Sequence, residues 1–600
     1  MPAFQLLASS EKCVDEGLLA VAATNPGLYL IPQHRLMVER GRLVKGRSGD
    51  RRKVALVSGG GSGHEPFSVG YVGVGMLAAS TAGHIFTSPP PTDIAAAITA
   101  VGRDNPEGVL VIVFNYTGDR INFGLAVERC RAAGMKVEMY ISGEDCALTQ
   151  LEGTAGRRGL CGTLFIFKIV GALVEGGASL EEAVDTCRKL GNALGTIGVA
   201  ASGCTLPGGT SPLFEVPEGR LELGLGVHGE TGAATIKAGS PKEVVETMLT
   251  QLTRKDSTTR LPLQEGDKVA VMVNNMGCLS QLEMNNLTKE IVSQLQSLGV
   301  SVERVYAGMM MTSLDMRGLH MSVLRLLDPA WLPLLDAPTT APAWTAPCLL
   351  NHFTAGEVLI PNLTLTLTQE KMDHDYIFSE EAQAQTLKAC LESVVSQLPR
   401  HEQDLNILDT VCGDGDCGST LMKGITVLSK WMSTLPVTQP RQVLNVLGEV
   451  SADAMGGTSG GLYSIMFTAI AASLSSTASS SRKMWAAALR AGCQAISKYG
   501  GATQGDRTML DALVPAVEAL EAGSDDDDLR SLLKAMAAAA DDGAKMTANM
   551  KARNEDSHGG GAGGAGGGVP GGGGHLFTRT SSRTHISLQG LAVCAVFQTS

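Results

Sequence analysis

The sequence has few aromatic residues, no closely paired cysteines and no excess of positive charge. Phe, Tyr and Trp make up 4% of the 600 residues, the 13 cysteines include no CxxC pair, and the formal net charge is −12. Because an acidic chain repels polyanions, we expect no direct nucleic-acid binding and no membrane binding. Scattered cysteines are typical of reduced thiols and favour a cytoplasmic location.

Long hydrophobic runs are missing as well. No stretch of 18 apolar residues occurs, and the N-terminal residues lack a basic segment followed by an apolar core. We therefore expect a soluble protein that is not secreted. With 44% hydrophobic and 18% charged residues, the chain is expected to form about two to four globular domains that bind small molecules.

Between residues 54 and 330, short β-branched runs alternate with helical patterns. We interpret four runs as buried parallel strands, namely KVALVS (53–58), VLVIVF (109–114), KVEMYI (136–141) and KVAVMV (268–273). They predict an α/β domain over residues 1–335. Since ligands collect at the carboxyl ends of such strands, SGGGSGHEP (58–66) and NYTGDR (115–120) are candidate site segments.

The second half of the chain has a different character. Residues 336–372 are rich in Pro, Ala and Thr and are predicted to be a linker. Leucines and valines then recur at helical spacing, so residues 373–552 are expected to form an all-α domain. Residues 553–600 form an atypical tail that begins with a low-complexity glycine tract, a composition that cannot pack.

The glycine-rich segment GGGSGH (59–64) matches neither a Walker A loop nor a dinucleotide-binding fingerprint. We interpret it as a strand-to-helix turn whose free backbone N–H groups hold a polar ligand, with His64 in the same cleft. The alternative is a tight turn with a surface histidine. Asp119 follows the next strand, and a carboxylate beside an imidazole suits proton transfer.

The segment DTVCGDGDCGST (409–420) brings three carboxylates within eight residues, those of Asp409, Asp414 and Asp416. The intervening glycines allow a backbone tight enough to aim the carboxylates at one point, although the spacing is not that of a calcium loop. Hard oxygen ligands of this kind suit Mg²⁺ that shares phosphate oxygens with a nucleotide. The alternative is a solvated acidic turn.

The segment MGGTSGGLY contains a formal GxSxG match, so a serine hydrolase that uses Ser459 is an alternative function. That motif requires a preceding strand, whereas helical patterns flank this segment on both sides. We therefore interpret Thr458 and Ser459 as a phosphate cradle at a helix N-terminus. In GDRTMLDAL, Arg507 and Thr508 begin another helix, where they could meet a nucleotide.

One histidine, His228, lies among four glycines in GLGVHGETG (224–232). Taken alone, the segment is typical of a turn with a surface histidine. If His228 instead contacts a substrate, we expect the glycines to make room for that substrate to reach the ring.

Seven motifs occur together in this order: SGGGSGHEP, NYTGDR, GLGVHGE, MVNNMG, GDGDCG, GGTSG and GDRTMLDAL. In them the chain resembles the dihydroxyacetone kinase family, most closely its two-domain, single-chain animal form. The resemblance covers roughly residues 10–550. It implies an α/β N-terminal substrate-binding domain and an all-α, helical-barrel nucleotide-binding domain, acting in a homodimer.

The resemblance also implies roles for individual residues. His228 attacks the substrate carbonyl and holds the triose as a covalent hemiaminal, while His64 and Asp119 act as acid and base. Substrate binding is implied for Gly61, Ser62, Gly63, His64, Phe114 and Asp119. Binding of two Mg²⁺ ions is implied for Asp409, Asp414 and Asp416. Nucleotide binding is implied for Gly413, Asp414, Gly415, Asp416, Cys417, Thr458, Ser459, Asp506, Arg507 and Thr508.

The implied reaction is the ATP-dependent phosphorylation of dihydroxyacetone and glyceraldehyde with Mg²⁺. The same nucleotide site is implied to split FAD into AMP and cyclic FMN, with Mn²⁺ or Co²⁺ as alternative metals. An innate RNA-sensor protein is an implied partner. The alternative from another class is a catalytically impaired scaffold or regulatory protein derived from this enzyme.

Two features depart from the family pattern. Phe114 stands where the family usually has a lysine that contacts the substrate, and a phenylalanine side chain cannot donate a hydrogen bond. The family's Arg-Ala-Ser segment and closing helix are missing after about residue 550, where the chain runs into the glycine tract. We expect this ending to lower stability and ATP affinity relative to a chain with the usual ending.

Overall fold

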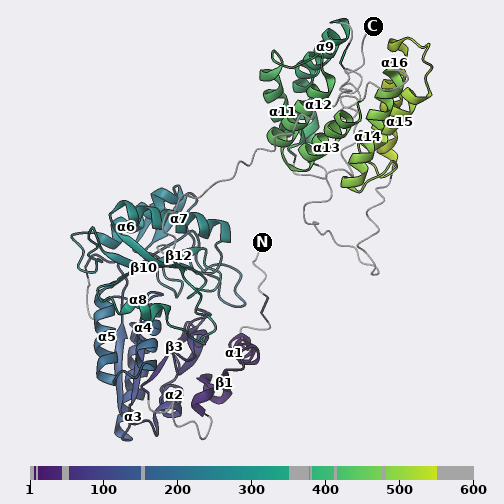
Figure 1. Cartoon of the computed structure of the whole chain (residues 1–600). Coiled ribbons are helices and arrows are strands. Elements are labelled where there is room, and N and C mark those ends of the chain that lie inside the picture. The colour runs from purple at the N-terminus through teal and green to yellow at the C-terminus, as the bar shows by residue number, and fades with distance from the viewer. Residues whose placement is uncertain are drawn as a thin grey trace. The chain divides into compact units, whose positions relative to one another are not determined.

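The computed structural model describes residues 6–7, 11–43, 53–150, 156–349, 377–378, 381–410, 415–474 and 481–550. The chain divides into two units, Met1–Ile360 (unit 1) and Pro361–Ser600 (unit 2), drawn in purple to teal and in green to yellow in Figure 1. Across those ranges, no helix combines the length and the apolar character needed to cross a membrane.

The first sheet of unit 1 has six strands in the order β1-β2-β4-β3-β5-β6. Their bounds are β1 (Leu28–Ile31), β2 (Leu36–Glu39), β3 (Ala55–Ser62), β4 (Ala79–Ile85), β5 (Val109–Phe114) and β6 (Val137–Ser142). Strands β4, β3, β5 and β6 are parallel, whereas β1 and β2 are antiparallel. Three of the predicted parallel strands are therefore confirmed. Strands β3 and β5 are buried throughout as predicted, but β6 is only partly buried, because it lies at the edge of the sheet.

The second sheet has seven strands in the order β13-β11-β10-β12-β7-β8-β9. Their bounds are β7 (Leu194–Ala200), β8 (Arg220–Leu223), β9 (Ala234–Lys237), β10 (Lys268–Asn275), β11 (Ser301–Gly308), β12 (Gly318–Arg325) and β13 (Cys348–Leu349). The fourth predicted run is strand β10, but of the strand pairs described in this sheet only β10–β11 is parallel. A helix joins the parallel strands β10 and β11, whereas loops join the antiparallel neighbours β7 to β8 and β8 to β9.

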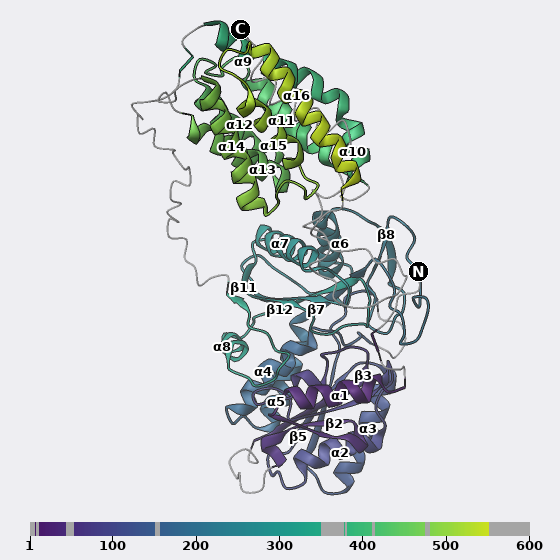
Figure 2. The same ribbon diagram turned by 90° about the vertical axis from the view of Figure 1, so that its right-hand side faces the viewer.

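Helices cover both sheets and fill the space between them. They are α1 (Cys13–Thr24), α2 (Pro91–Gly102), α3 (Thr117–Ala132), α4 (Thr163–Glu175), α5 (Leu180–Asn192), α6 (Pro241–Thr253), α7 (Gln281–Ser297) and α8 (Trp331–Asp336). Figure 2 shows α6 and α7 on one side of the second sheet and α4 on the other. Because α4 shares one apolar core with strands of both sheets, nearly all of its residues are buried. It therefore fixes the two sheets against each other.

The glycine-rich segment does not form the predicted strand-to-helix turn. Residues 59–62 continue β3, and the next α-helix, α2, begins only after β4. A side chain at Gly59 would collide with the carbonyl oxygen of Thr81, and a Cβ at Gly61 would lie 2.7 Å from the backbone nitrogen of Thr87. The glycines are thus needed because neighbouring backbone lies directly against the strand.

The segment predicted as a linker begins as part of unit 1. The backbone N–H of Thr340 donates to Val74 O at 3.1 Å, and that of Ala343 donates to Gly70 O at 2.9 Å. Strand β13 then pairs with β11. Residues 350–376 lie outside the described ranges, so the limits 1–335 and 336–372 stay predictions.

Unit 2 is built of helices, as expected from its sequence pattern. They are α9 (Glu381–Gln397), α10 (Glu402–Asp409), α11 (Cys417–Trp431), α12 (Pro440–Val450), α13 (Gly457–Ser473), α14 (Ser481–Gly500), α15 (Leu510–Ala522) and α16 (Leu529–Met546). Leu387 and Leu391 of the predicted apolar stripe are buried in one of its cores. The tail over residues 553–600 lies outside the described part, and its expected effect on stability and ATP affinity stays a prediction.

Candidate functional site

His64 follows the end of β3 and lies where the two sheets of unit 1 meet. Its Nδ1 is 3.0 Å from the carbonyl oxygen of Thr312, while its buried Nε2 has no hydrogen-bond partner among the described residues. Burial, together with nearby His228, lowers the pKa of His64 to about 3. The ring is therefore neutral, with Nδ1 as donor and Nε2 available as a base.

His228 lies in the loop between β8 and β9, and its ring faces three other rings edge-on. The centroid distances are 4.9 Å to His64, 5.4 Å to Phe86 and 4.6 Å to Tyr116. Burial lowers the pKa of His228, although Glu230 acts in the opposite direction. The structure thus brings together two predicted histidines whose positions in the chain are 164 residues apart, and it favours the unprotonated form of both.

The four glycines of this loop do not make room for a substrate. A side chain would collide with Glu230 if placed at Gly226 and with Leu213 if placed at Gly229. At Gly224 a Cβ would lie 2.7 Å from the Cβ of Ala147, and Gly232 is similarly crowded by Leu223. The expectation from the sequence is wrong here, because protein atoms occupy the space that the missing side chains leave.

Asp119 lies in the first turn of α3, directly after β5. Because β3 and β5 are parallel neighbours, Asp119 and His64 follow strand ends at the same edge of the sheet. Burial raises the pKa of Asp119 to about 6, and its Oδ1 is buried with no hydrogen-bond partner in the described ranges. A carboxyl with this pKa changes its protonation state close to neutral pH, as a general base requires.

Phe114 at the end of β5 contributes only apolar surface. Its ring lies 4.5 Å from that of Phe67 and 6.1 Å from that of Phe167, within the core that joins the sheets. Only 3% of Phe114 is exposed. Phe114, at the position where the resemblance implies a lysine, therefore offers a substrate no side-chain hydrogen bond.

The glycine-rich strand borders a cavity of about 240 Å³. Gly61 and Ser62 line it on one side, and apolar residues of α1 such as Leu18 line it on the other. Ser62 Oγ donates to Gly83 O at 2.8 Å, and the Gly63 N–H donates to the side chain of Glu65 at 3.1 Å. In the described structure these polar groups of the predicted substrate loop already have protein partners.

In unit 2, Asp409 ends α10 with a wholly buried side chain. Its Oδ2 accepts backbone N–H groups of Gly415, Asp416 and Cys417 at 3.0, 3.0 and 3.3 Å. Its Oδ1 is buried and has no hydrogen-bond partner within the part of the chain that the structure describes. A buried carboxylate oxygen without a partner is costly, and a cation would satisfy it.

Asp416 lies at the N-cap of α11 and is exposed. Asp409 and Asp416 supply the hard oxygen atoms that Mg²⁺ prefers, so the residues present fit this ion. Gly413 and Asp414 lie outside the described ranges, and the residues inside them contain no converging group of three His, Cys, Asp or Glu. The third predicted ligand, Asp414, therefore stays a prediction.

The GGTSG segment begins a helix. Gly456 and Gly457 have φ angles of 64° and 59° and connect a π-helical turn over Ser451–Met455 to α13. Thr458 is exposed and Ser459 half-buried in the first turn of α13, where backbone N–H groups lack helical partners. Since a helical turn and not a strand precedes Ser459, the serine-hydrolase interpretation is excluded.

The predicted nucleotide residues Asp506, Arg507 and Thr508 form a loop before α15. Arg507 has a left-handed φ of 61°. The side chain of Asp511, only 2% exposed, accepts the N–H of Thr508 at 2.7 Å and also that of Gly505. Asp511 thus holds both ends of the loop, and Asp506 inside it accepts the backbone N–H and the hydroxyl of Thr503 at 2.8 and 2.9 Å.

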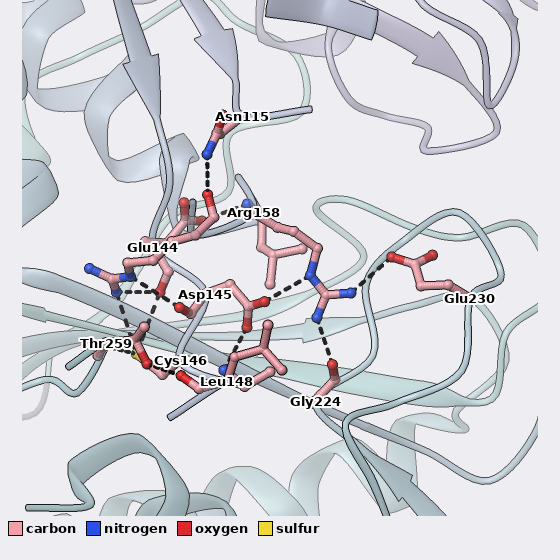
Figure 3. Close-up of polar contacts among 12 residues, drawn as sticks. Asn115, Glu144, Asp145, Cys146, Leu148, Arg158, Gly224, Glu230 and Thr259 are labelled. Carbon is pink, nitrogen blue, oxygen red and sulfur yellow. Dashed lines mark hydrogen bonds and ion pairs between the residues drawn. The ribbon is translucent and has the colours of Figure 1, made fainter. Parts of the chain in front are cut away.

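The sequence analysis did not single out several residues that lie around these sites. Asp511 had a local signal, because Thr508-x-x-Asp511 is a capping pattern at a helix start. Tyr116 lies in a quoted motif, yet nothing in the sequence places its ring against His228. Arg158 contacts Glu230 at 3.0 Å over a separation of 72 residues, which no local pattern reveals. Figure 3 shows Arg158 between Asp145 and Glu230.

Comparisons with known proteins match both units. The model of the Dak1 domain matches residues 20–343, and that of the DAK2 domain matches residues 411–576. The human protein named triokinase/FMN cyclase is 41% identical over 557 residues, which cover 92% of this chain and 94% of that protein.

Solved structures agree with this. The native dihydroxyacetone kinase of C. freundii matches with a TM-score of 0.70 and 30% identity, covering 99% of this chain and 100% of the other. The same enzyme in complex with AMP-PNP and Mg²⁺ matches with a TM-score of 0.69 and 28% identity, over 99% of this chain and 100% of the other. The mixed-sheet N-terminal unit followed by a helical unit is thus the architecture of these relatives.

Proposed function

The chain belongs to the dihydroxyacetone kinase family, and from this premise we propose that it phosphorylates dihydroxyacetone and glyceraldehyde with ATP. In a second reaction at the nucleotide site, it splits FAD into AMP and cyclic FMN. The observation that carries the proposal is the pair of imidazoles of buried His64 and half-buried His228, whose centroids lie 4.9 Å apart and whose pKa values are both lowered.

In the kinase reaction, a ring nitrogen of His228 adds to the substrate carbonyl carbon. The carbonyl oxygen takes up the proton that the imidazole gives up, so the adduct is a neutral hemiaminal. This reversible bond tethers a substrate too small to gain much noncovalent affinity, since even the best small ligands gain at most about 1.5 kcal/mol per heavy atom. It also selects ketones and aldehydes over glycerol, which has no carbonyl.

The hydroxyl that receives the phosphoryl group must lose its proton. Asp119, with a pKa of about 6, and the free Nε2 of His64 are the bases that the substrate unit offers. Both groups are buried, so bulk water has little direct access to them. Phe114 adds an apolar wall, which suits a small neutral substrate.

The helical unit holds the nucleotide. Asp409 and Asp416 would hold Mg²⁺, which when bound neutralises charge on the phosphates. The first turn of α13, with Thr458 and Ser459, provides N–H and hydroxyl donors for phosphate oxygens, and Arg507 provides positive charge. FAD carries a diphosphate too, so the same donors serve the cyclising reaction, with Mn²⁺ or Co²⁺ as alternative metals.

We also propose a cytoplasmic location. The buried thiols of Cys146, Cys161 and Cys187 form no disulfide, as is usual in a reducing compartment. A homodimer and an innate RNA-sensor partner rest on the family resemblance, and sedimentation of the purified chain tests the dimer.

The proposal is tested by mixing the purified chain with Mg²⁺, ATP and dihydroxyacetone, and separately with FAD. We expect triose phosphate from the first mixture and AMP with cyclic FMN from the second. Glycerol in place of dihydroxyacetone is the control and should give no product. A chain that binds ATP but turns over neither substrate would support the scaffold alternative and overturn the proposal.

A further inference from the structure

Arg158 lies beside the loop that carries His228 and contacts both ends of it. Its Nη2 donates to the carbonyl oxygen of Gly224 at 2.6 Å, and its Nη1 lies 3.0 Å from Glu230 Oε1. Its Nε donates to Asp145 Oδ2 at 2.8 Å. The guanidinium therefore uses all three of its nitrogens to join the loop to Asp145, as Figure 3 shows.

Glu230 passes this connection on to His228. While one carboxylate oxygen of Glu230 faces Arg158, the other accepts the backbone N–H of His228 at 2.8 Å. Gly226 lies directly against the pair, because a Cβ there would collide with Glu230 and approach Arg158 Nη1 to 2.9 Å. Glycine at position 226 is thus what allows the ion pair to cross the loop.

The other end of the connection is rigid. Asp145 is 5% exposed, and its Oδ1 accepts the backbone N–H of Ala147 at 2.9 Å. The neighbouring Arg157 donates to the carbonyl oxygens of Glu144 and Leu194 at 2.6 and 2.9 Å. These hydrogen bonds therefore fix the segment after β6 to the start of β7. Asp145, which pairs with Arg158, lies in that fixed segment.

A loop with four glycines has little stiffness of its own, and glycine loses more backbone entropy on ordering than any other residue. A covalent step needs the ring nitrogen and the carbonyl carbon aligned at close approach. We propose that Arg158 and Glu230 are positioning residues that hold the loop so that the His228 ring meets the substrate carbonyl. This inference rests on the proposed covalent role of His228.

The opposite charges of Arg158 and Glu230 also favour attack by the His228 ring. A lone carboxylate beside His228 would stabilise the imidazolium, which has no lone pair with which to attack a carbonyl. Arg158 offsets the charge of Glu230 at 3.0 Å. Arg158 thus offsets part of the charge that Glu230 places beside the ring, while it also pairs with Asp145.

The test compares Arg158→Met, Arg158→Lys and Glu230→Gln with wild type. The probe is dihydroxyacetone labelled with ¹³C at the carbonyl carbon, because hemiaminal formation shifts that resonance strongly upfield. For Arg158→Met we expect loss of the adduct signal and a kcat/KM for dihydroxyacetone lower by roughly 100-fold. For Arg158→Lys and Glu230→Gln we expect an adduct signal and a kcat/KM between those of Arg158→Met and wild type. Each of these variants keeps part of the connection between Asp145 and the loop.

Arg325→Met is the matched control. Arg325 makes a similar two-point ion pair with Asp267, at 2.8 and 3.0 Å, and is also mostly buried in unit 1. This variant should keep the adduct signal and kcat/KM whatever its melting temperature. Cleavage of FAD reports on unit 2 and should be equal in all variants.

Equal adduct and kcat/KM in Arg158→Met and wild type would overturn the positioning role, as would an equal loss in Arg325→Met. If Arg158→Met does not fold, Glu230→Gln decides by the same criterion, because it keeps the contact between Arg158 and Asp145. A wild type that turns over dihydroxyacetone without any adduct signal would overturn the covalent role of His228, and this inference with it.

Discussion

The two units hold their sites in opposite ways. In unit 1, His64 is held by Thr312 across 248 residues of sequence, and Arg158 by Glu230 across 72. In unit 2, Asp409 binds backbone groups six to eight residues away, and Asp511 binds groups three and six residues away. One site is assembled from distant segments, and the other from single turns of chain.

The difference corresponds to two kinds of chemistry. In the proposed reaction the reacting groups of unit 1 belong to the protein. Burial lowers the pKa of His64 to about 3, which keeps the ring neutral, and raises that of Asp119 to about 6. In unit 2, Asp416 and Thr458 are exposed at helix starts, where the proposed function has a metal ion and a nucleotide complete the site. A site that acts through its own groups needs a rigid frame, whereas one completed by ligands can be local.

The largest separation between the units is expected from His228→Ala. Without the ring nitrogen the triose is no longer tethered, so triose phosphorylation should fall by roughly 10³-fold or more. Cleavage of FAD should be unchanged, because it uses groups of unit 2. Both rates are measured on one preparation, and a parallel loss of the two would contradict a division of labour between the units.

The reverse experiment is Asp409→Asn, which removes the charge of a buried carboxylate with an unpartnered oxygen. We expect both phosphorylation and FAD cleavage to fall by roughly 100-fold, with a higher Mg²⁺ concentration needed for half-maximal rate. The ¹³C adduct signal should remain. Asp526→Asn, in the exposed acidic segment before α16, is the control and should leave all three readouts as in wild type.

A smaller effect is expected from Asp511→Ala. It leaves the buried N–H of Thr508 and that of Gly505 without their acceptor, at a cost of about 1–3 kcal/mol. If the loop then loosens, the KM for ATP rises roughly tenfold, while the KM for dihydroxyacetone stays constant. Asp541→Ala, which removes a surface partner of Lys545, serves as the control. A rise in both KM values would argue against a local role.

The smallest effect concerns pH. Burial raises the pKa of Asp119 to about 6, so the ionised, basic form is lost as the pH falls through 6. At pH 5 about a tenth of the carboxyl groups is ionised, and kcat/KM for dihydroxyacetone should be about tenfold below its plateau. His64, with a pKa of about 3, adds no limb in this range. If kcat/KM of the Asp119→Asn variant still falls below pH 6, a group other than Asp119 causes that fall.

The local support of the candidate residues can be inferred from the sequence more readily in unit 2 than in unit 1. Asp409 and the loop before α15 are held by groups close in the chain, so one motif contains both a candidate residue and its support. The placement of His64 against His228 and Thr312 depends on how two sheets meet, which no local pattern encodes. For unit 1, the order of the seven motifs in the sequence identified the candidate residues but not how they lie relative to one another.

The wrong expectations have local causes that only the structure reveals. The segment 59–62 looked like a turn because glycines are typical of turns, yet they lie in β3 against the backbone of Thr81 and Thr87. The glycines around His228 leave space for Glu230 and Leu213 and not for substrate. In both places the glycine is needed because other protein atoms approach the backbone closely. The sequence does not show which atoms these are, because they come from distant parts of the chain.

The contact between His64 and Thr312 has a consequence for how the protein is made. Residues 63–65 pair with residues 312–314 through backbone N–H groups of Thr312 and Leu314 and through the Thr312 hydroxyl. A nascent chain that ends before residue 312 lacks the groups that orient His64. Under the proposed function, activity toward trioses is therefore expected only after residues 312–314 have been made and the two sheets have docked.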